Sequence, residues 1–247
     1  CGPHAKRVYI PILKETEMSF GTQLKAIVEL KEKESDVSQY IKKFFDNVEC
    51  IYVDRFRQKY THELPEQVET QLNRIVKNKK INGVIIATDP LNHMQYALWA
   101  QKQNLNILMD KPISTYENIA NSIEQARHLQ LDYELLMKNY NPNKAFIINA
   151  QRRFLPQFEI VQNLINEIAK KYGMPVTSMQ STHSDGQWRL PNEILTLKYH
   201  PLLGWGKVSH SGYHFIDMAS KIVKDSFISA EKKFDELSVY SKFIRPS

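Results

Sequence analysis

The stretch INGVIIATDPLNHMQYALWAQKQNLNILMD, residues 81–110, decides the fold. It contains two short apolar runs, 81–90 and 105–110, on either side of a segment, 91–104, in which apolar residues recur at helical spacing. A continuous apolar run is typical of a strand buried on both faces, and such strands occur in parallel sheets. A strand, a helix and a second strand of these lengths predict a βαβ unit.

The same alternation of strand and helix precedes this stretch. Residues 23–30 and 48–54 have the composition of strands, whereas residues 35–47 and 65–80 have helical spacing. Ser35 is the expected N-cap of the first of these helices, and Pro65 stands at the start of the second. The glycine near the start of CGPHAKRVYIPILKE is followed by a helix-like segment, so the strand expected to lead into it would lie upstream. The sequence therefore predicts an α/β domain with a parallel sheet.

Downstream, the pattern changes from strict alternation to longer helices. Helical spacing predicts helices over 115–130 and 132–140, a strand over 144–151 and an amphipathic helix over 156–173 that closes at Gly173. Residues 175–183 alternate in the manner of a half-exposed strand, and 184–206 are rich in loop-forming residues. A last helix is expected to end near Lys224.

The composition is that of an ordinary globular protein. The chain has 247 residues, of which 42% are hydrophobic and 24% are charged. No apolar run approaches the length needed to span a bilayer, and the two cysteines, Cys1 and Cys50, suit a reducing compartment. We therefore predict a cytoplasmic protein that binds no membrane.

The net charge of +6 comes from 33 basic and 27 acidic residues. A basic balance indicates nucleic-acid binding only when the charge is concentrated on one face or arm. Here lysines and arginines are spread along the chain in short groups such as KNKK at 77–80. We predict no nucleic-acid partner, although a positive field also suits an anionic cofactor or substrate.

Four pieces of sequence follow one another along residues 1–217: CGPHA (1–5), VIIATDPLNHMQYALWA (84–100), NILMDKPIS (106–114), and INAQRRFLPQF (148–158) with GYHFID (212–217). In this order and spacing they resemble the glucose–fructose oxidoreductase and inositol dehydrogenase family, Gfo/Idh/MocA. The third piece is similar to the family's Glu-Lys-Pro signature, with Asp110 in place of the glutamate.

The resemblance implies a Rossmann-type parallel sheet domain over residues 1–150, without its first strand, and a partial substrate domain over 151–247. In the family the second domain is α/β with an open, mostly antiparallel sheet, through which members commonly pair as homo-oligomers. The implied function is an NAD(P)-dependent oxidoreductase, a dehydrogenase acting on CH-OH groups of a sugar, polyol or sugar derivative.

The resemblance also implies the catalytic residues. Lys111 matches the lysine of Glu-Lys-Pro, placed near the nicotinamide and the reacting hydroxyl. His214 matches the family's histidine, proposed as general acid and base, a task that suits an imidazole because its ordinary pKa of about 6.5 is near neutral pH. His210 stands where dehydrogenase members carry an aspartate. Two imidazoles on one helix face disfavour double protonation, so this departure leaves open a catalytically silent nucleotide- or sugar-binding protein on the same scaffold.

For the cofactor, Gly2 and Ala5 match the second and third small positions of the family's Gly-x-Gly-x-x-Gly/Ala turn. Glu29, near the end of a predicted strand, suits the ribose hydroxyls of NAD, whereas Lys31 suits the 2′-phosphate of NADP. The cofactor is thus NAD or NADP. Three further residues match the family's cofactor groove: Thr88, Pro90 and His93.

The histidine pair also has the spacing of zinc ligands on a helix. A zinc site needs a third ligand, and nothing in the sequence brings one close to His210 and His214. We therefore predict no metal. The double arginine, Arg152 and Arg153, is expected to include at least one structural residue that pairs across the domain junction.

Overall fold

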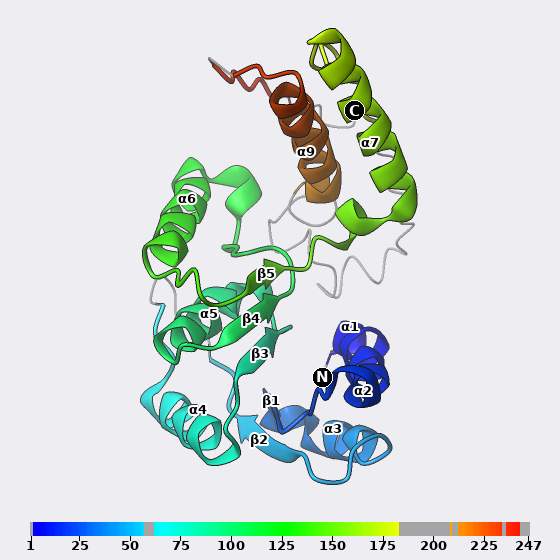
Figure 1. The fold of residues 1–247 in the computed structure, drawn as a ribbon. Helices are drawn as coiled ribbons and strands as arrows, with labels where there is room; N and C mark the ends of the chain where they lie inside the picture. The colour runs from blue at the N-terminus through cyan, green and yellow to red at the C-terminus, as the bar shows by residue number, and fades with distance from the viewer. Residues whose placement is uncertain (1, 57–61, 183–207, 209–211, 234–235, 243–247) are drawn as a thin grey trace, which may run out of the picture. The chain divides into compact units, whose positions relative to one another are not determined.

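The computed structural model describes residues 2–56, 62–182, 208, 212–233 and 236–242 of the chain. The described residues divide into two compact units (Figure 1). The first comprises residues 2–56, 62–149 and 208, and the second comprises residues 150–182, 212–233 and 236–242.

Every strand that the structure describes in the first unit runs parallel to its neighbours. β1 (Ala26–Leu30) pairs with β2 (Glu49–Val53). The three others pair in the order β3 (Gly83–Ile86), β4 (Asn106–Met109) and β5 (Phe146–Ile148). The apolar runs at 81–90 and 105–110 thus form adjacent parallel strands, as the sequence predicts, and the fold is the predicted α/β class.

The five described strands form two separate sheets, because β1 does not pair with β3. Within the described residues, β1 pairs only with β2, and β3 pairs only with β4. In the doubly wound fold, the strand order runs outward in both directions from the first strand of the sheet, so that strand lies where the two halves of the sheet meet. Ligands of these folds bind beyond the carboxyl ends of the strands at that switch point. The two described sheets, β1–β2 and β3–β4–β5, have the strand orders of the two halves on either side of such a switch point.

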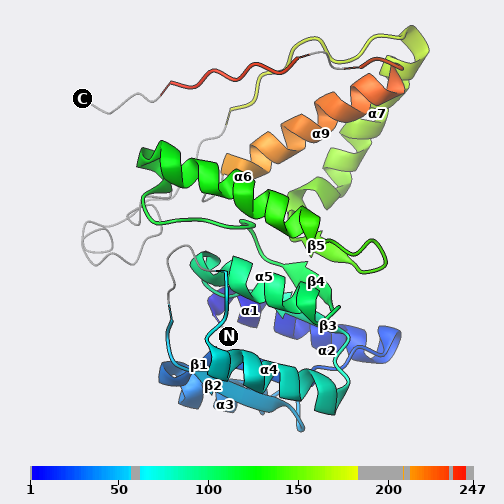
Figure 2. The same ribbon diagram turned by 90° about the vertical axis from the view of Figure 1, so that its left-hand side faces the viewer.

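Helices cover both faces of the strands (Figures 1 and 2). One side carries α1 (Pro3–Arg7), α2 (Tyr9–Phe20) and α3 (Glu34–Ile41). The other side carries α4 (Glu66–Lys79) and α5 (His93–Lys102), with α6 (Ile123–Lys138) beyond them, and short 3-10 helices lie at Lys31–Lys33, Pro90–Asn92 and Ile119–Asn121. This arrangement buries strand side chains on both sides, such as Ile27 in β1 and Ile107 in β4, and explains the apolar character of the strands.

Two hydrophobic cores lie on the two faces. Ile27 packs with residues of α2 and α3, such as Ile10 and Val37. Its neighbour Val28 packs instead against the larger core, which includes residues of β2, β4 and α5. Successive side chains of a strand point to opposite faces, so β1 contributes to both cores in alternation.

Shortening one buried side chain of β4 should measurably lower stability. Ile107 is 2% exposed, and Ile107→Val removes one methylene and leaves a small void. We expect the free energy of unfolding to fall by about 0.5–1.5 kcal/mol in urea titrations. The matched control is Ile147→Val in β5, where the isoleucine is 52% exposed. An equal loss in both variants would contradict the assigned burial.

The second unit contains a helix pair. A 3-10 helix, Gln151–Phe154, leads into α7 (Pro156–Tyr172), which lies beside α9 (Tyr213–Ser229) in both views (Figures 1 and 2). The predicted end of α7 at Gly173 is confirmed: this glycine adopts φ 61°, in the left-handed region that favours a residue without a side chain. Buried Ser226 joins α9 to the chain after α7, because its hydroxyl accepts a hydrogen bond from the Val176 amide at 3.1 Å.

Three local predictions are wrong. Ser35 is not the N-cap of α3, because a 3-10 turn starts the helical segment earlier and Lys33 holds the cap position. Residues 115–122 do not begin a long helix; α6 starts at Ile123, where the Ser122 hydroxyl accepts from the Gln125 amide. Residues 175–182 form no strand in the structure. The open antiparallel sheet of the second domain stays a prediction, since the described part of this unit contains no strand.

Candidate active site

The carboxyl ends of the parallel strands bring the predicted residues of the first unit to one edge. Glu29 ends β1 with Leu30, Thr88 follows β3, and Lys111 follows β4 after Asp110. Asn149 follows β5, and its amide donates to the Met109 carbonyl at 2.8 Å. Because parallel strands point the same way, these side chains gather at the edge where α/β folds bind ligands.

Asp110 connects the Lys111 turn to the predicted nucleotide turn. Its Oδ1 accepts the backbone N–H of Lys111 at 2.9 Å, and its Oδ2 lies 3.5 Å from Nε2 of His4. His4 belongs to α1, which begins directly after Gly2. The predicted nucleotide turn and the strand end that carries Lys111 are therefore neighbours.

Tyr9 and Asn149, which were not predicted from the sequence, extend this network. The Asn149 side-chain amide donates to the Tyr9 hydroxyl at 2.7 Å. Burial, with the nearby charge of Asp110 as a second cause, raises the pKa of Tyr9 to about 12. The phenol therefore stays protonated at neutral pH. A polar residue directly after a parallel strand, as Asn149 is, was the available signal.

The two small residues of the predicted nucleotide turn have different surroundings. A side chain built at Gly2 would meet no heavy atom of the described residues within 4 Å, and its φ of −65° suits any residue. Neither strain nor crowding within the described protein therefore explains this glycine. Ala5 is 9% exposed and packs inward, which suits the small residue that allows close packing of helix and strand.

Glu29 lies at the end of β1 with its carboxylate oriented locally. Its Oε1 accepts the Leu30 amide at 2.9 Å. The pKa of Tyr96, in α5, is raised to about 12 by burial and further by the charge of Glu29. Lys31, the alternative residue for a 2′-phosphate, instead donates to Asp54 at 2.7 Å.

The segment after β3 is fixed by its own hydrogen bonds. The Asp89 carboxylate accepts the Leu91 amide at 3.1 Å, which caps the 3-10 helix at Pro90. Asn92 donates to the Phe56 carbonyl at 3.3 Å, linking this segment to the chain after β2. Thr88 is exposed and Pro90 is half-buried, so both can be reached from outside, as residues lining a cofactor groove must be.

His93 differs from these residues because it is fully buried. Its Nδ1 lies 2.7 Å from the carbonyl oxygen of Pro112, the residue after Lys111. Burial lowers the pKa of His93, and the hydrogen bond to Pro112 only partly opposes this. The imidazole is therefore neutral at neutral pH and is not offered to a ligand at the surface. Its predicted role in the cofactor groove stays a prediction.

The buried neutral imidazole should make the fold sensitive to acid. The unfolded chain takes up a proton at His93 near pH 6.5, whereas the folded chain does so only at lower pH. The contribution to stability is therefore full above about pH 6.5 and falls as the pH drops below it, by at most about 1.4 kcal/mol per pH unit. Urea titrations at pH 7.5 and 5.5 should show a smaller acid loss in His93→Asn than in the wild type. An identical loss would contradict the assignment.

In the second unit, His214 is the second residue of α9 and is 7% exposed. Its Nε2 lies 2.6 Å from the Tyr213 hydroxyl, and the two rings are 4.1 Å apart between centroids. A hydroxyl can donate to a neutral imidazole or accept from a protonated one. The pair thus has the chemistry for moving a proton. His210, its predicted companion, lies outside the described residues.

Arg152 and Arg153 both make contacts within the second unit. Arg153 binds both carboxylate oxygens of Asp217, with Nε at 2.9 Å from Oδ2. The hydrogen bond to Asp217 raises the pKa of Arg153. Arg152 lies over the Phe215 ring at 5.1 Å. The expected structural pairing is thus found, but within this unit, since Arg153 and Asp217 both belong to it.

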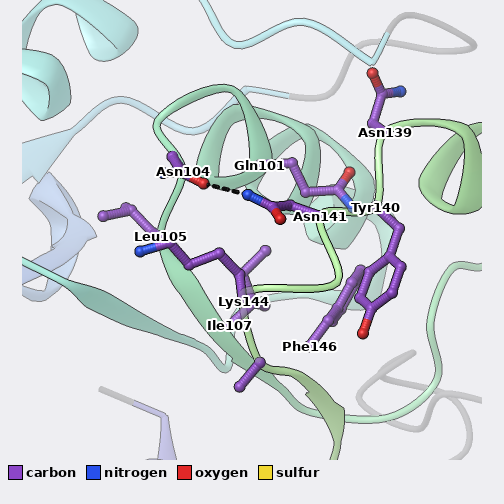
Figure 3. Close-up of a pocket in the computed structure, with 10 residues that line it drawn as sticks. Gln101, Asn104, Leu105, Ile107, Asn139, Tyr140, Asn141, Lys144 and Phe146 are labelled. Carbon is purple, nitrogen blue, oxygen red and sulfur yellow. Dashed lines mark hydrogen bonds between the residues drawn. The ribbon is translucent and has the colours of Figure 1, made fainter.

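A small pocket lies at the opposite edge of the first unit (Figure 3). It encloses about 240 Å³, part of it open to solvent, and amide side chains such as Asn104 and Asn141 line it. These two residues hydrogen-bond each other at 2.8 Å. The pocket lies beside Leu105 and Phe146, at the amino-terminal ends of β4 and β5, so it is separate from the edge that carries Lys111.

The described residues contain neither a cluster of metal ligands nor a helix that could cross a membrane. No three His, Cys, Asp or Glu side chains in that part of the chain come together as metal ligands would. Among its helices, none combines the length and apolar character that crossing a membrane requires.

Comparison with known proteins gives one match. Residues 14–134 match the family model described as an oxidoreductase family with an NAD-binding Rossmann fold, GFO_IDH_MocA. No curated protein and no solved structure matches the chain. The matched range includes Glu29, Thr88, Pro90, His93 and Lys111, and it agrees with the parallel strands and two-sided helix layers. Residues 14–134 of this chain therefore belong to the NAD-binding Rossmann fold of the Gfo/Idh/MocA oxidoreductase family.

Proposed function

We propose that the protein transfers a hydride between a nicotinamide cofactor and a carbon of a sugar, polyol or sugar derivative. The observation that carries this proposal is the position of Lys111, two residues after the end of β4 in an NAD-binding fold, at the edge of the sheet where such folds bind ligands. The backbone on both sides of Lys111 is hydrogen-bonded. An amine carried by a hydrogen-bonded backbone at that edge suits contact with a reacting hydroxyl.

The residues present at this edge fit a dinucleotide. Gly2 leaves open space where a side chain would otherwise stand, in a turn next to Asp110. Glu29 offers a carboxylate at the end of β1, where the ribose hydroxyls of NAD are held in this fold. Exposed Thr88 and half-buried Pro90 flank the same edge. When bound, the nicotinamide supplies or accepts the hydride.

In this proposal the protein's own side chains manage the hydroxyl proton. Lys111 donates a hydrogen bond to the substrate oxygen and stabilises negative charge as it develops there. His214 takes the hydroxyl proton at a ring nitrogen during oxidation and returns it during reduction. The Tyr213 hydroxyl, 2.6 Å from Nε2, orients the imidazole. His210, which lies outside the described residues, is proposed as a further catalytic residue.

The experiment combines a binding and a turnover assay. Reduced cofactor is titrated with the purified protein and followed by its fluorescence, and its oxidation is then measured with a panel of keto-sugars. We expect saturable binding and oxidation with at least one member of the panel. Absence of binding would overturn the proposed cofactor site.

Binding without turnover on any sugar would favour the alternative function, a silent nucleotide- or sugar-binding protein. The observation behind it is His210, which stands where dehydrogenase members of the family carry an aspartate. A carboxylate holds a neighbouring histidine's tautomer and stabilises its cation. Activity gained in His210→Asp would show that the wild-type protein lacks turnover because it has a histidine in place of the aspartate.

Glu29 should decide between the two forms of the cofactor. Its carboxylate binds the ribose hydroxyls of NAD and repels the 2′-phosphate of NADP. We expect Glu29→Ala to weaken NAD binding about tenfold or more, the value of a hydrogen bond to a charged group. The same variant should bind NADP more strongly relative to NAD than the wild type does. Isothermal titration with both cofactors measures this. Glu32→Ala, which removes an exposed carboxylate paired with Arg55, is the control and should bind as the wild type does.

A further inference from the structure

His93 and Pro112 form a contact between two elements far apart in sequence. His93 is the first residue of α5, and its Nδ1 lies 2.7 Å from the Pro112 carbonyl oxygen. A carbonyl oxygen only accepts hydrogen bonds, so Nδ1 must carry the proton and donate. The tautomer is thereby fixed, with the lone pair of the neutral ring on Nε2.

Packing alone does not explain a histidine at this position. The side chain is 0% exposed and its neighbour Met94 belongs to the main hydrophobic core. Nε2 is buried and, among the described residues, has no hydrogen-bond partner. A buried polar atom without a partner costs free energy, and an apolar residue would avoid that cost. The Thr88 backbone acts on the ring more weakly than the Pro112 carbonyl does, so the hydrogen bond of good geometry that His93 makes within the described residues is the one from Nδ1 to Pro112.

That hydrogen bond completes the fixation of the Lys111 backbone. On one side, the Lys111 amide donates to Oδ1 of Asp110 at 2.9 Å. On the other side, Pro112 has no amide proton to offer, so its carbonyl is the group through which neighbouring elements can hold it. The Lys111–Pro112 peptide lies between these two hydrogen bonds.

We propose that His93 is a positioning residue, which fixes the amine of Lys111 by holding the Pro112 carbonyl. This inference rests on the proposed function, in which Lys111 contacts the substrate oxygen. Reacting groups must be held closely, because a displacement of about 1 Å can reduce the rate about 100-fold. His93 touches neither substrate nor cofactor in this role.

Three substitutions of His93 separate the hydrogen bond from the volume of the ring. Asparagine places its amide nitrogen where Nδ1 stands and can still donate to Pro112. Glutamine places its amide near the position of Nε2, and leucine has no donor. We expect kcat to fall up to about 100-fold in His93→Leu and His93→Gln, with rescue to within a few-fold in His93→Asn and an unchanged Kd for NADH. Met94→Ala, which weakens the same core without touching the Pro112 carbonyl, should lower stability but keep kcat.

A second measurement tests the proposal without turnover. Lysines are reductively methylated with ¹³C-formaldehyde, and the Lys111 signal is assigned by its absence in Lys111→Arg. This signal should move or broaden in His93→Leu and His93→Gln and stay in place in His93→Asn. An unshifted signal in a folded His93→Gln protein would overturn the positioning role, even in a protein that oxidises no sugar. A shifted signal without turnover in the wild type would uphold it and reject the proposed function instead. If His93→Leu does not fold, the asparagine and glutamine variants decide.

Discussion

Lys111→Ala is expected to lower kcat for the proposed sugar substrate by about 100- to 10,000-fold, the range typical of removing a group that assists proton transfer. The physical reason is the loss of a cation that stabilises charge on the reacting oxygen at the end of β4. The affinity for NADH should change little, because the nucleotide turn at Gly2 and the carboxylate of Glu29 remain. Steady-state kinetics and a fluorescence titration measure the two effects separately.

Lys102→Ala is the matched control for this variant. Lys102 is an exposed lysine in the last turn of α5, so its replacement removes the same charge away from the strand ends. We expect wild-type kinetics. Equal kcat in wild type, Lys111→Ala and Lys102→Ala would remove Lys111 from the mechanism.

His214→Asn should produce a loss of similar size, about 100- to 10,000-fold in kcat. Asparagine retains hydrogen-bonding capacity next to the Tyr213 hydroxyl but cannot take up the hydroxyl proton. The pH profile of kcat should lose the ionisation that the histidine contributes, which a purely structural role would leave in place. Both quantities come from steady-state rates between pH 5.5 and 9.

His128→Asn is the control for the second variant. His128 packs against Tyr116, with ring centroids 5.4 Å apart, on α6 of the first unit. Its replacement should leave kcat and its pH profile unchanged. A pH profile of His214→Asn that matches the wild type would show that another group handles the proton.

The fold of the first unit could be predicted because its signals are local. Parallel strands buried on both faces appear as short continuous apolar runs, and β3 and β4 lie inside the runs at 81–90 and 105–110. The start of α6 was predictable but was placed too early. Ser122 and Gln125 have the Ser-x-x-Gln spacing of a capping box, and this was the signal that the helical periodicity from residue 115 obscured.

The contacts of the candidate site could not be predicted in the same way. His93 and Pro112 are 19 residues apart, and Tyr9 and Asn149 are 140 apart. Such pairs depend on which strands become neighbours and how each helix is rotated, which no local pattern encodes. The strand predicted at 175–183 was wrong for a related reason, because alternation shows a face but not the partner strand that a sheet requires.

Residue type could suggest the chemistry at a position but not its environment. His93 fits a cofactor groove by its place in the sequence pattern, yet its side chain is 0% exposed. Asp110 was noted only as a replacement for glutamate, although it contacts both Lys111 and His4. Burial and hydrogen-bond partners assign such roles, and both follow from tertiary packing.

The central claim is that Lys111 and His214 act on the same substrate oxygen beside one bound nicotinamide. A crystal structure of the protein with NAD bound tests it most directly, by the distances from Lys111 Nζ and from the His214 ring nitrogens to the nicotinamide ring. The account predicts that both groups border the ring, close enough to reach one substrate hydroxyl between them. A nicotinamide bound away from Lys111, or the two side chains on opposite sides of the molecule, would contradict it.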